Sequence, residues 1–346
     1  MSFGAGPDGL LWRVGTEAVD LSGLGDLFSQ RTLNPLMAQG RRVWESAIMA
    51  ARTYDGPRIP LAGADLRLPF EVADYVDFYS SLEHATNLGR MFRPDQEPLL
   101  PNWRWLPVAY HGRAGSVVVS GTDVVRPRGQ RKAPDADAPT FGPTQRLDFE
   151  LELGFVVGVP TELGEPAPVE AFEDHVFGVV LVNDWSARDI QAWEYQPLGP
   201  NLGKSFQTSI SAWVTPLAVL DGARVEAPPQ EPPPLPHLEG GRDWGLDIAL
   251  DVELNGETIS RGNAKTLYWT LPQQLAHATS NGARLRTGDL MASGTISGAE
   301  PGSEGSMIEL FHGERFLGDG DEIVLHGTAK GVELGEVRGR VLPALA

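Results

Sequence analysis

Cysteine is absent from the sequence. Without thiols the chain can form no disulfide, no thiolate metal site and no cysteine nucleophile. Seven histidines supply its only imidazole groups. Any metal ion that this chain binds must therefore take oxygen or imidazole ligands.

Basic side chains are scarce relative to acidic ones. The 28 lysines and arginines face 46 aspartates and glutamates, which gives a formal net charge of −18. A field of this sign repels phosphate groups, so it argues against nucleic acid or an anionic membrane as a partner. A small anionic ligand could bind only where a metal ion or a few local cations reverse the field.

Long apolar runs are also missing. No stretch approaches the roughly 20 apolar residues of a membrane helix, and residues 1–9 have neither the basic region nor the apolar core of a secretory signal. Hydrophobic residues make up 41% of the chain and charged residues 21%, as in ordinary globular proteins. We expect a soluble, cytoplasmic protein whose 346 residues form one large domain or two of ordinary size.

The first 69 residues are expected to form a small N-terminal subdomain. Residues 10–14 and 18–21 read as a hairpin, and the apolar period of residues 35–51 predicts a helix. Residues 58–69, which are rich in Pro, Leu and Gly, are the best candidate linker to a second domain at 70–346.

Short β-like runs punctuated by Gly and Pro follow from residue 70 onward. Examples are residues 116–125, 177–182, 248–254 and 322–326. Long helical patterns are few, so we predict a mainly β architecture with some helix. The six prolines of residues 228–236 predict an extended surface segment.

An acidic alternation, Leu-Asp-Phe-Glu-Leu-Glu, occupies residues 147–152. In a strand, Asp148, Glu150 and Glu152 would share one face, because side chains alternate with a period of two. Burying three like charges without a counter-charge is prohibitive, so the face requires a cation or open water. The alternative is a half-buried strand with a solvated acidic face.

Asp77 and His84 are the first acid and imidazole that could share a site. If residues 76–84 are helical, the seven-residue spacing puts both side chains on one face. The alternative is a surface pair or a satisfied histidine of the core.

A second candidate begins where the apolar run of residues 177–182 ends. Asp184 falls just past this predicted buried strand, at the rim of a sheet where ligands commonly bind. Ser186 could be the N-cap of a short helix that follows. Burial of that segment is indicated by Trp185 and Trp193.

That helix would present Arg188, Gln191 and Tyr195 on one face, at positions i, i+3 and i+7. All three can donate hydrogen bonds to an anion or a developing oxyanion. A solvated helix face is the alternative.

Lys204 lies in a Gly-rich segment whose glycines allow close approach of the backbone to a ligand. The spacing does not match a phosphate-binding loop. The residues after it look β-like, so Lys204 and Thr208 would point to the same side and could face one pocket.

Two C-terminal segments are further candidates for parts of a functional site. Residues 288–298 suit a tight turn whose N–H groups and hydroxyls meet a carboxylate, or an ordinary hairpin. Residues 306–310 alternate like a strand, which would leave Glu309 opposite its apolar neighbours and able to orient a histidine as a general base.

Together these segments resemble the fumarylacetoacetate hydrolase family, from about residue 70 to Pro343 and in the same order. The resemblance rests on D-F-Y-S-S-x-x-H-A-T-N at 77–87, L-P-V-x-Y-H-G-R at 106–113, S-V-V-V-S-G-T at 116–122, L-D-x-E-L-E at 147–152, N-D-W-S-A-R-D-I-Q-x-W-E-Y at 183–195, P-L-G-P-x-L-G-K-S-F at 197–206 and L-R-x-G-D-L-x-A-S-G-T-I-S-G at 285–298. The family usually has a longer leading domain, so residues 1–69 are expected to be a trimmed version of it.

The resemblance implies a mixed β-sandwich roll of the fumarylacetoacetate hydrolase type and a homodimer. It also implies a metal-dependent hydrolase that cleaves the C–C bond of a β-diketone acid. In that reaction 4-fumarylacetoacetate and water give fumarate and acetoacetate, the last step of tyrosine and phenylalanine catabolism.

The resemblance also implies a role for each matching position. The implied ligands of a divalent cation, Mg²⁺ or Ca²⁺, are Asp77, Glu150, Glu152 and Asp184, with Thr208 near a weaker cation contact. The implied general base is His84, oriented by Glu309. The implied oxyanion group is Arg188, Gln191 and Lys204, and the implied substrate contacts are Tyr79, Arg93, Tyr110, Gln191, Tyr195 and Thr295. Asp148 is not carried over as a ligand, and we expect it either to support the ligands from behind or to form a salt bridge to a nearby arginine.

Two alternatives remain open. The same fold could carry a related acylpyruvate hydrolase or a β-keto acid decarboxylase. A metal-binding scaffold without catalysis would be expected to lack the base or the oxyanion group, and His84, Glu309, Arg188 and Lys204 are all present.

Overall fold

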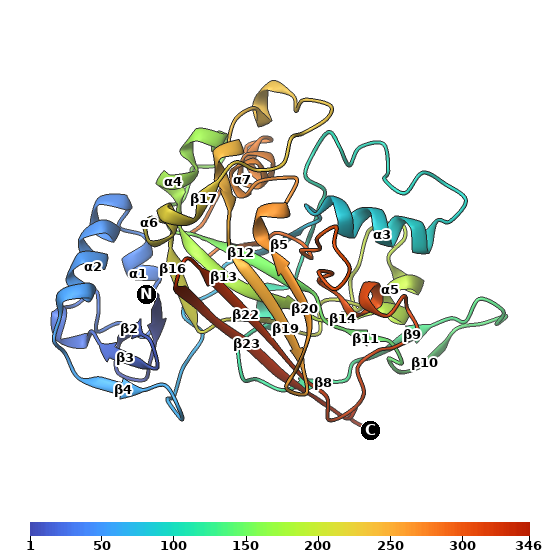
Figure 1. Cartoon of the computed structure of the whole chain (residues 1–346), viewed down its shortest axis with the longest axis horizontal. Coiled ribbons are helices and arrows are strands. Elements are labelled where there is room, and N and C mark those ends of the chain that lie inside the picture. The colour runs from blue at the N-terminus through green and yellow to red at the C-terminus, as the bar shows by residue number, and fades with distance from the viewer.

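The computed structural model describes all of residues 1–346 and is built mainly from β-strands. Two large sheets face each other, with the helices at the periphery (Figure 1). The mainly β architecture predicted from the sequence is confirmed. None of the helices is both long and apolar enough to cross a bilayer.

The larger sheet has 12 strands, and ten of them follow the order β4-β3-β2-β1-β16-β13-β12-β21-β5-β6. The other two, β15 and β7, pair with each other, and β15 also pairs with β13. Their bounds are β1 Phe3–Ala5, β2 Leu10–Val14, β3 Glu17–Asp20, β4 Arg58–Pro60, β5 Tyr75–Phe78, β6 Ala109–His111, β7 Val117–Val119, β12 Leu151–Val157, β13 Val176–Asp184, β15 Thr208–Ile210, β16 Trp213–Pro216 and β21 Leu290–Ala292.

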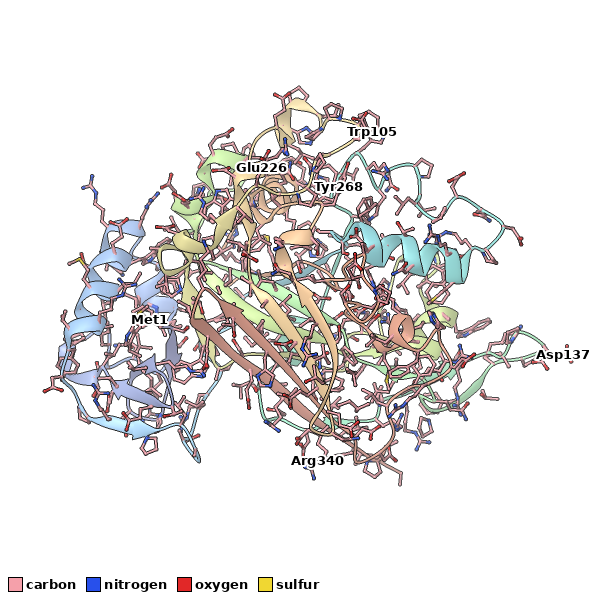
Figure 2. The ribbon with its side chains drawn as sticks, viewed as in Figure 1. Met1, Trp105, Asp137, Glu226, Tyr268 and Arg340 are labelled. Carbon is pink, nitrogen blue, oxygen red and sulfur yellow. The ribbon has the colours of Figure 1, made fainter.

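The second sheet has five strands in the order β20-β19-β22-β23-β8. They are β8 Val124–Val125, β19 Ala249–Leu254, β20 Glu257–Asn263, β22 Glu322–Ala329 and β23 Val332–Leu342. Three two-stranded pairs complete the β-structure: β9 Arg128–Arg131 with β10 Thr140–Pro143, β11 Leu147–Asp148 with β14 Ser186–Ala187, and β17 Arg224–Val225 with β18 Gly245–Leu246. The β9–β10 hairpin projects from the body, and Asp137 lies near its tip (Figure 2).

Strands β12 and β13 are buried on both faces. Phe155 and Leu181 belong to the core against the five-stranded sheet, which contributes Leu325 among others. Residues of opposite parity, such as Val156 and Val180, belong to a second core shared with the N-terminal segment. Because no side of β12 meets solvent, an acidic residue on this strand cannot be satisfied by open water.

The N-terminal segment extends the larger sheet. Strand β1 pairs antiparallel with β16, so β1 to β4 continue the sheet of the rest of the chain. The predicted boundary at residue 69 stays a prediction, and Figure 1 shows the N-terminal segment as a lobe at one side of the sandwich. The proposed linker is not wholly irregular, because β4 lies within it and pairs with β3.

The helices are short: α1 Asn34–Met37, α2 Arg41–Thr53, α3 Leu82–Phe92, α4 Phe172–His175, α5 Arg188–Glu194, α6 Leu217–Leu220, α7 Leu271–Thr279 and α8 Met307–Leu310. The single helix predicted for residues 35–51 is wrong. Gly40, at φ 83°, divides it into α1 and α2, because this left-handed backbone cannot continue a right-handed helix.

Of two other segments, one differs from the sequence prediction and one agrees with it. The strand predicted for residues 116–125 is interrupted and forms β7 and β8, which lie in different sheets. The proline-rich residues 228–235 form neither helix nor strand, in line with the extended segment that was predicted.

Candidate functional site

Four carboxylates from distant segments meet at the centre of the larger sheet. We call Asp77, Glu150, Glu152 and Asp184 the acid cluster; one ligand oxygen from each lies within 4.8 Å of the others. Adjacent strands bring them together, because β13 pairs with β12, and β21 lies between β12 and β5. Asp77 lies on β5, so the helix expected for residues 76–84 is wrong at its start.

The acid cluster has the properties of a site for a hard divalent cation. All four side chains are buried, with at most 4% of their surface exposed. Both carboxylate oxygens of Glu152 and Oδ1 of Asp77 have no hydrogen-bond partner. Burial, with the charges of neighbouring acids, raises the pKa of Glu152 and of Asp77 well above the usual range. Four oxygen ligands without sulfur suit Mg²⁺ or Ca²⁺, so the residues present fit the implied cation.

Two cations border one side of the acid cluster. The Nζ of Lys204 forms ion pairs with Glu150 and, at 2.6 Å, with Asp184. Arg188 Nη2 lies 2.9 Å from Glu150 Oε1. Burial raises the pKa of Glu150, but the charges of Lys204 and Arg188 outweigh burial and hold this pKa well below its usual range.

A close backbone contact carries Lys204 to this position. Gly203 lies against α5, where an added Cβ would come 2.7 Å from the Cβ of Gln191. The Ala187 N–H also donates to the Gly203 carbonyl at 2.8 Å. Glycine is therefore required for the loop to approach α5 closely enough to place the next residue in the cluster.

His84 and Glu309 form a buried pair beside the acid cluster. His84 Nδ1 lies 2.6 Å from Glu309 Oε2, and both side chains are almost fully buried. His84 is in the first turn of α3, and its backbone N–H donates to the side chain of the N-cap residue Ser81. Glu309 therefore holds the ring at Nδ1, while Nε2 lies 3.8 Å from Glu150 Oε1.

Glu309 is held by more than the imidazole. Its carboxylate accepts hydrogen bonds from Ser306 at 2.6 Å, Ser297 at 3.0 Å and Asn87 at 2.9 Å. Burial raises the pKa of Glu309, but the adjacent His84 and these donors outweigh burial and lower it to about 2. The predicted strand at residues 306–310 is wrong, because Glu309 lies on the short helix α8.

The helix that follows Asp184 is present but begins later than expected. Asp184 is the last residue of β13, and Ser186 lies in β14, where its hydroxyl donates to the Asp184 carbonyl. The N-cap of α5 is Ala187, so the assignment of Ser186 as N-cap is wrong.

Only part of the predicted polar face of α5 reaches the site. Arg188 is buried and its Nη1 donates to Gln191 Oε1 at 3.4 Å. Tyr195 is 42% exposed, and its hydroxyl accepts a hydrogen bond from Gln196. Trp193 is exposed as well, so it does not bury the segment as the sequence suggested.

Among the remaining predicted residues, some contact the acid cluster or His84 and one does not. Tyr110 donates to Asp184 Oδ2 at 2.7 Å and Thr208 donates to Asp184 Oδ1 at 3.0 Å, so both contact the acid cluster. The Tyr79 ring lies edge-on to the His84 ring, with centroids 5.3 Å apart. Arg93 follows the last residue of α3 and donates to the Pro98 carbonyl.

Thr295 follows the last predicted turn. It is buried and its hydroxyl has no partner. The turn before it needs glycine, because Gly294 has φ 78° and an added Cβ would come 2.1 Å from the Phe78 carbonyl oxygen.

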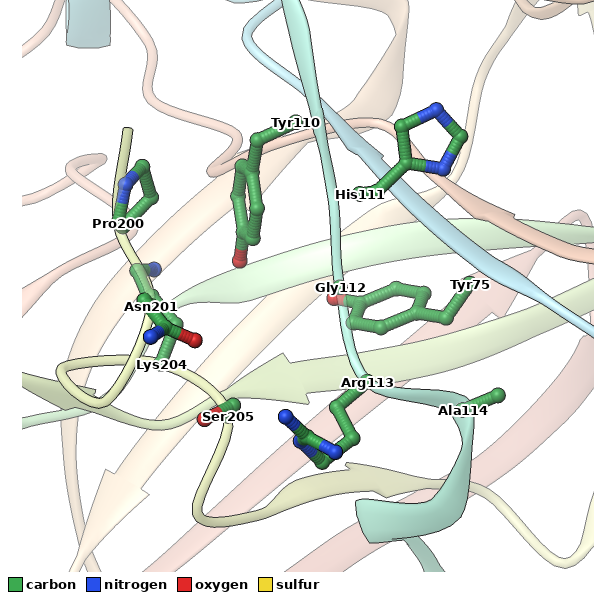
Figure 3. A pocket seen from close by; sticks show the side chains of 10 residues that line it. All are labelled: Tyr75, Tyr110, His111, Gly112, Arg113, Ala114, Pro200, Asn201, Lys204 and Ser205. Carbon is green, nitrogen blue, oxygen red and sulfur yellow. The ribbon is translucent and has the colours of Figure 1, made fainter. Parts of the chain in front are cut away.

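A pocket of about 300 Å³ is lined by Tyr110 and Lys204, whose polar atoms also contact Asp184 of the acid cluster (Figure 3). Arg113 and His111 also line it, and neither forms an ion pair with an acid. The buried Tyr75 hydroxyl, which has no partner, lies in its wall. The volume suits a small molecule, and the basic groups suit an anion.

Sequence reasoning missed the residues that surround the catalytic candidates. Asn87 follows His84 by three positions on α3, and Ser306 precedes Glu309 by three, so a helical spacing could have indicated both. Tyr75 shares a strand face with Asp77, two residues on. Ser297 lies in the turn at residues 288–298 whose hydroxyls were expected to meet a carboxylate, but that pattern does not indicate Glu309 as its partner.

Known proteins resemble the chain in sequence and in fold. The model of the family described as fumarylacetoacetate (FAA) hydrolase C-terminal matches residues 74–342. Fumarylacetoacetase of Caenorhabditis elegans is 49% identical over 92% of this chain and 85% of its own length, and that of Homo sapiens is 47% identical with the same coverage.

Solved structures share the fold at low sequence identity. A fumarylacetoacetate hydrolase from Exiguobacterium antarcticum superposes with a TM-score of 0.65 at 18% identity, covering 99% of both chains. A maleylpyruvate hydrolase from Sphingobium sp. SYK-6, in complex with manganese(II) ion and pyruvate, gives 0.60 at 18% identity over the full length of both. With the family model covering most of its length and relatives close to half identical, the chain belongs to the fumarylacetoacetate hydrolase family.

Proposed function

We propose that this protein hydrolyses 4-fumarylacetoacetate to fumarate and acetoacetate in a metal-dependent reaction, the last step of tyrosine and phenylalanine catabolism. The observation that carries the proposal is the position of the His84–Glu309 pair, 3.8 Å from a buried cluster of four carboxylates. Metal-assisted hydrolysis uses a metal site next to a general base, and here the site is rich in oxygen ligands and the base is oriented by a carboxylate.

The acid cluster would hold a divalent cation, Mg²⁺ or Ca²⁺, through Asp77, Glu150, Glu152 and Asp184, with Thr208 as a weaker contact. When bound, this cation would supply Lewis-acid polarisation of the two carbonyls of a 1,3-dicarbonyl substrate. Four carboxylates exceed the charge of a dication by two. Arg188, which also pairs with Asp148, and Lys204 offset much of this excess, which lowers the repulsion that an anionic substrate meets in a protein of net charge −18.

His84 acts as the general base in this proposal. Glu309, with a pKa of about 2, is ionised near neutrality and accepts the Nδ1 proton. Nε2 is then the unprotonated nitrogen, and it can remove a proton from water as the oxygen attacks the ketone carbonyl of the fumaryl group, which becomes the new carboxyl group of fumarate.

Arg188, Gln191 and Lys204 stabilise the oxyanion that this attack produces. Arg188 Nη2 is buried and lies 2.9 Å from Glu150 Oε1, so a guanidinium donor is held at the edge of the acid cluster. Collapse of the tetrahedral intermediate breaks the C–C bond and leaves the electron pair on acetoacetate as an enolate. Protonated His84 can return its proton there, which regenerates the base.

The substrate would be held by residues around this centre. We assign substrate contacts to Tyr79, Arg93, Tyr110, Gln191, Tyr195 and Thr295. The unpartnered hydroxyl of Thr295 and the basic pocket at Tyr110 support this assignment, because the substrate carries two carboxylates. A catalytic unit at residues 70–346, a homodimer and a cytoplasmic location are further predictions.

A direct assay tests the proposal. Purified protein is supplied with Mg²⁺ or Ca²⁺ and given fumarylacetoacetate, and both the loss of substrate absorbance and the appearance of fumarate are followed. A panel of acylpyruvates and β-keto acids is run beside it. Preferred turnover of fumarylacetoacetate is the expected result. Faster turnover of an acylpyruvate, or carbon dioxide release from a β-keto acid, would favour the related hydrolase or decarboxylase, and no turnover at all would favour a scaffold.

A further inference from the structure

Asp148 is the acid of residues 147–152 that stands outside the acid cluster. It is completely buried and yet fully hydrogen-bonded. Oδ1 accepts from the backbone N–H groups of Phe149 and Met307, both at 2.8 Å, while Oδ2 accepts from the Ile308 N–H at 3.1 Å and from Arg188 Nε at 2.9 Å. An ionised carboxylate has about four lone-pair positions, so no acceptor position remains for a metal ion or substrate.

Arg188 is the first group that Asp148 fixes. The guanidinium is planar, so the Nε hydrogen bond to Asp148 sets the plane in which the other two nitrogens lie. Nη1 donates to Gln191, and Nη2 points at the cluster, where it lies 2.9 Å from Glu150 Oε1. The direction in which Arg188 presents Nη2 to the cluster therefore depends on Asp148.

The start of α8 is the second group. Met307 and Ile308 are its first two residues, whose N–H groups have no acceptor within a helix. Asp148 accepts from both. Glu309 is the next residue and contacts His84 at 2.6 Å, so any shift of residues 307 and 308 passes directly to the carboxylate that orients the base.

We propose that Asp148 is a positioning residue that holds the oxyanion donor Arg188 and the base-orienting residue Glu309 in one rigid frame. The inference rests on the proposed function, because it assigns Asp148 to the geometry of that reaction. Asp148 contacts neither the substrate nor the metal, and it acts through two residues that are 121 positions apart in the chain. Catalysis is sensitive to such placement, since near-attack geometry is lost within about 1 Å.

Asp148→Asn is the principal test. The new amide would turn its NH₂ group toward one of the two pairs of N–H donors, and this donor-to-donor contact displaces either Arg188 or α8. We expect kcat to fall about 100-fold, while KM and the affinity for Mg²⁺ or Ca²⁺ stay at wild-type values.

Asp189→Asn is the matched control. Asp189 is the neighbour of Arg188 on α5, and its carboxylate also accepts from backbone N–H groups, those of Gln145 and Ile190. It does not bond to α8 or to the Arg188 guanidinium. We expect wild-type kcat from this variant, and an equal fall in kcat for both variants would overturn the inference.

A mutant cycle separates positioning from general loss of stability. Asp148→Asn is introduced into Arg188→Gln and into Glu309→Gln backgrounds, where one of its two targets is already lost. If Asp148 is a positioning residue, Asp148→Asn should lower kcat by a smaller factor in each of these backgrounds than in the wild-type protein, because the losses overlap. If Asp148→Asn lowers kcat in both backgrounds by the same factor as in the wild-type protein, the proposal is contradicted.

A second pair of variants applies if Asp148→Asn does not fold. Met307→Pro removes one N–H donor to Asp148, and Ser306 has the extended backbone that proline tolerates before it. Met307→Ala removes the same buried side chain but keeps the N–H. We expect kcat of the proline variant to be about tenfold below that of the alanine variant, and equal values would overturn the inference.

Failure of the function is distinguishable from failure of this inference. If the wild-type protein does not cleave fumarylacetoacetate, the proposed function is wrong. If the wild-type protein cleaves it and the Asp148 and Met307 variants behave as their controls do, only the positioning role is wrong.

Discussion

Two acidic segments of this chain, residues 147–152 and the β22–β23 pair, have opposite surroundings. Glu150 and Glu152 lie on or beside β12, where both faces of the sheet are covered, and the oxygens of Glu152 have no hydrogen-bond partner. On β22 and β23, by contrast, Glu322 and Glu336 lie on a solvent face and pair with Arg338 at 2.6 and 3.1 Å. Acidic side chains on strands therefore form surface ion pairs in one place and a candidate cation site in the other. The covering of the strand decides between them.

Two of the histidine–glutamate pairs show a similar contrast between buried and exposed surroundings. His84 and Glu309 are buried and 2.6 Å apart, whereas His326 and Glu253 are about one-third exposed and 3.6 Å apart. Buried polar groups in tight contact are costly to leave unpartnered, and they cluster where a protein carries out chemistry. The predictions below exploit these matched pairs.

The largest effect is expected at the two histidines. His84→Gln should lower kcat by about 10²- to 10⁴-fold, because general base catalysis contributes this much. His326→Gln should leave kcat unchanged. Steady-state kinetics on fumarylacetoacetate compare the two variants, and a His84→Gln enzyme with the wild-type rate would remove His84 from the mechanism.

The next effect concerns the stabilisation that a bound ion provides. At an ion concentration 100 times Kd, the wild-type protein should gain about 2.7 kcal/mol in the free energy of unfolding. Glu152→Gln should lose most of this gain, since it removes a carboxylate whose two oxygens are otherwise unpartnered. Denaturant unfolding with Ca²⁺ or with a chelator measures the gain, and an undiminished gain in Glu152→Gln would contradict the ligand role.

The pH dependence of stability should differ between the ion-free and ion-loaded protein. Burial raises the folded-state pKa of Glu152 well above its ordinary value of 4.5, so the folded state binds this proton more tightly than the unfolded state does. Stability of the chelated protein should therefore fall as pH rises from about 4.5 toward the raised pKa. Ion binding should abolish this fall. Unfolding curves over a pH series test this, and parallel profiles with and without ion would contradict it.

Glu309 should change stability with pH in the opposite direction, because its folded-state pKa is lowered to about 2. Its ionised form is favoured by folding, so it stabilises the protein above pH 4.5 and this contribution is lost as pH falls toward 2. Glu309→Gln should therefore flatten the acid limb of the stability profile, and an unchanged acid limb would contradict the assignment.

The smallest effect is expected on the solvent face. Glu322→Gln breaks ion pairs with Arg338 and Arg340, yet exposed pairs contribute at most about 1 kcal/mol. We expect a small decrease in the free energy of unfolding, with full activity and full stabilisation by the ion. A decrease as large as that of a core substitution would break the comparison between the two segments.

Local patterns predicted several elements well. Strand β2 coincides with the predicted residues 10–14, and β13 contains the apolar run that placed Asp184 at the end of a strand. The mainly β architecture followed from short runs between glycines and prolines. These features depend on neighbours in sequence, so a local pattern suffices to find them.

The errors arose where distant contacts decide the local structure. Residues 306–310 alternate like a strand, yet the carboxylate of Asp148 accepts the first N–H groups of a helix there. Asp77 was expected on a helix, but pairing with β21 and β6 holds it in a strand. His84 and Glu309 are 225 residues apart, and no spacing rule predicts their contact. Only the family resemblance brought these residues together before the fold was known.

The central claim is that a divalent cation in the acid cluster is required for hydrolysis, and one titration tests it most directly. The protein is stripped with a chelator and desalted, and fumarylacetoacetate turnover is then measured while Mg²⁺ or Ca²⁺ is added in fractions of an equivalent. We predict no turnover at the start and a linear rise that ends at one ion per chain. Full turnover by the stripped protein before any ion is added would contradict the claim.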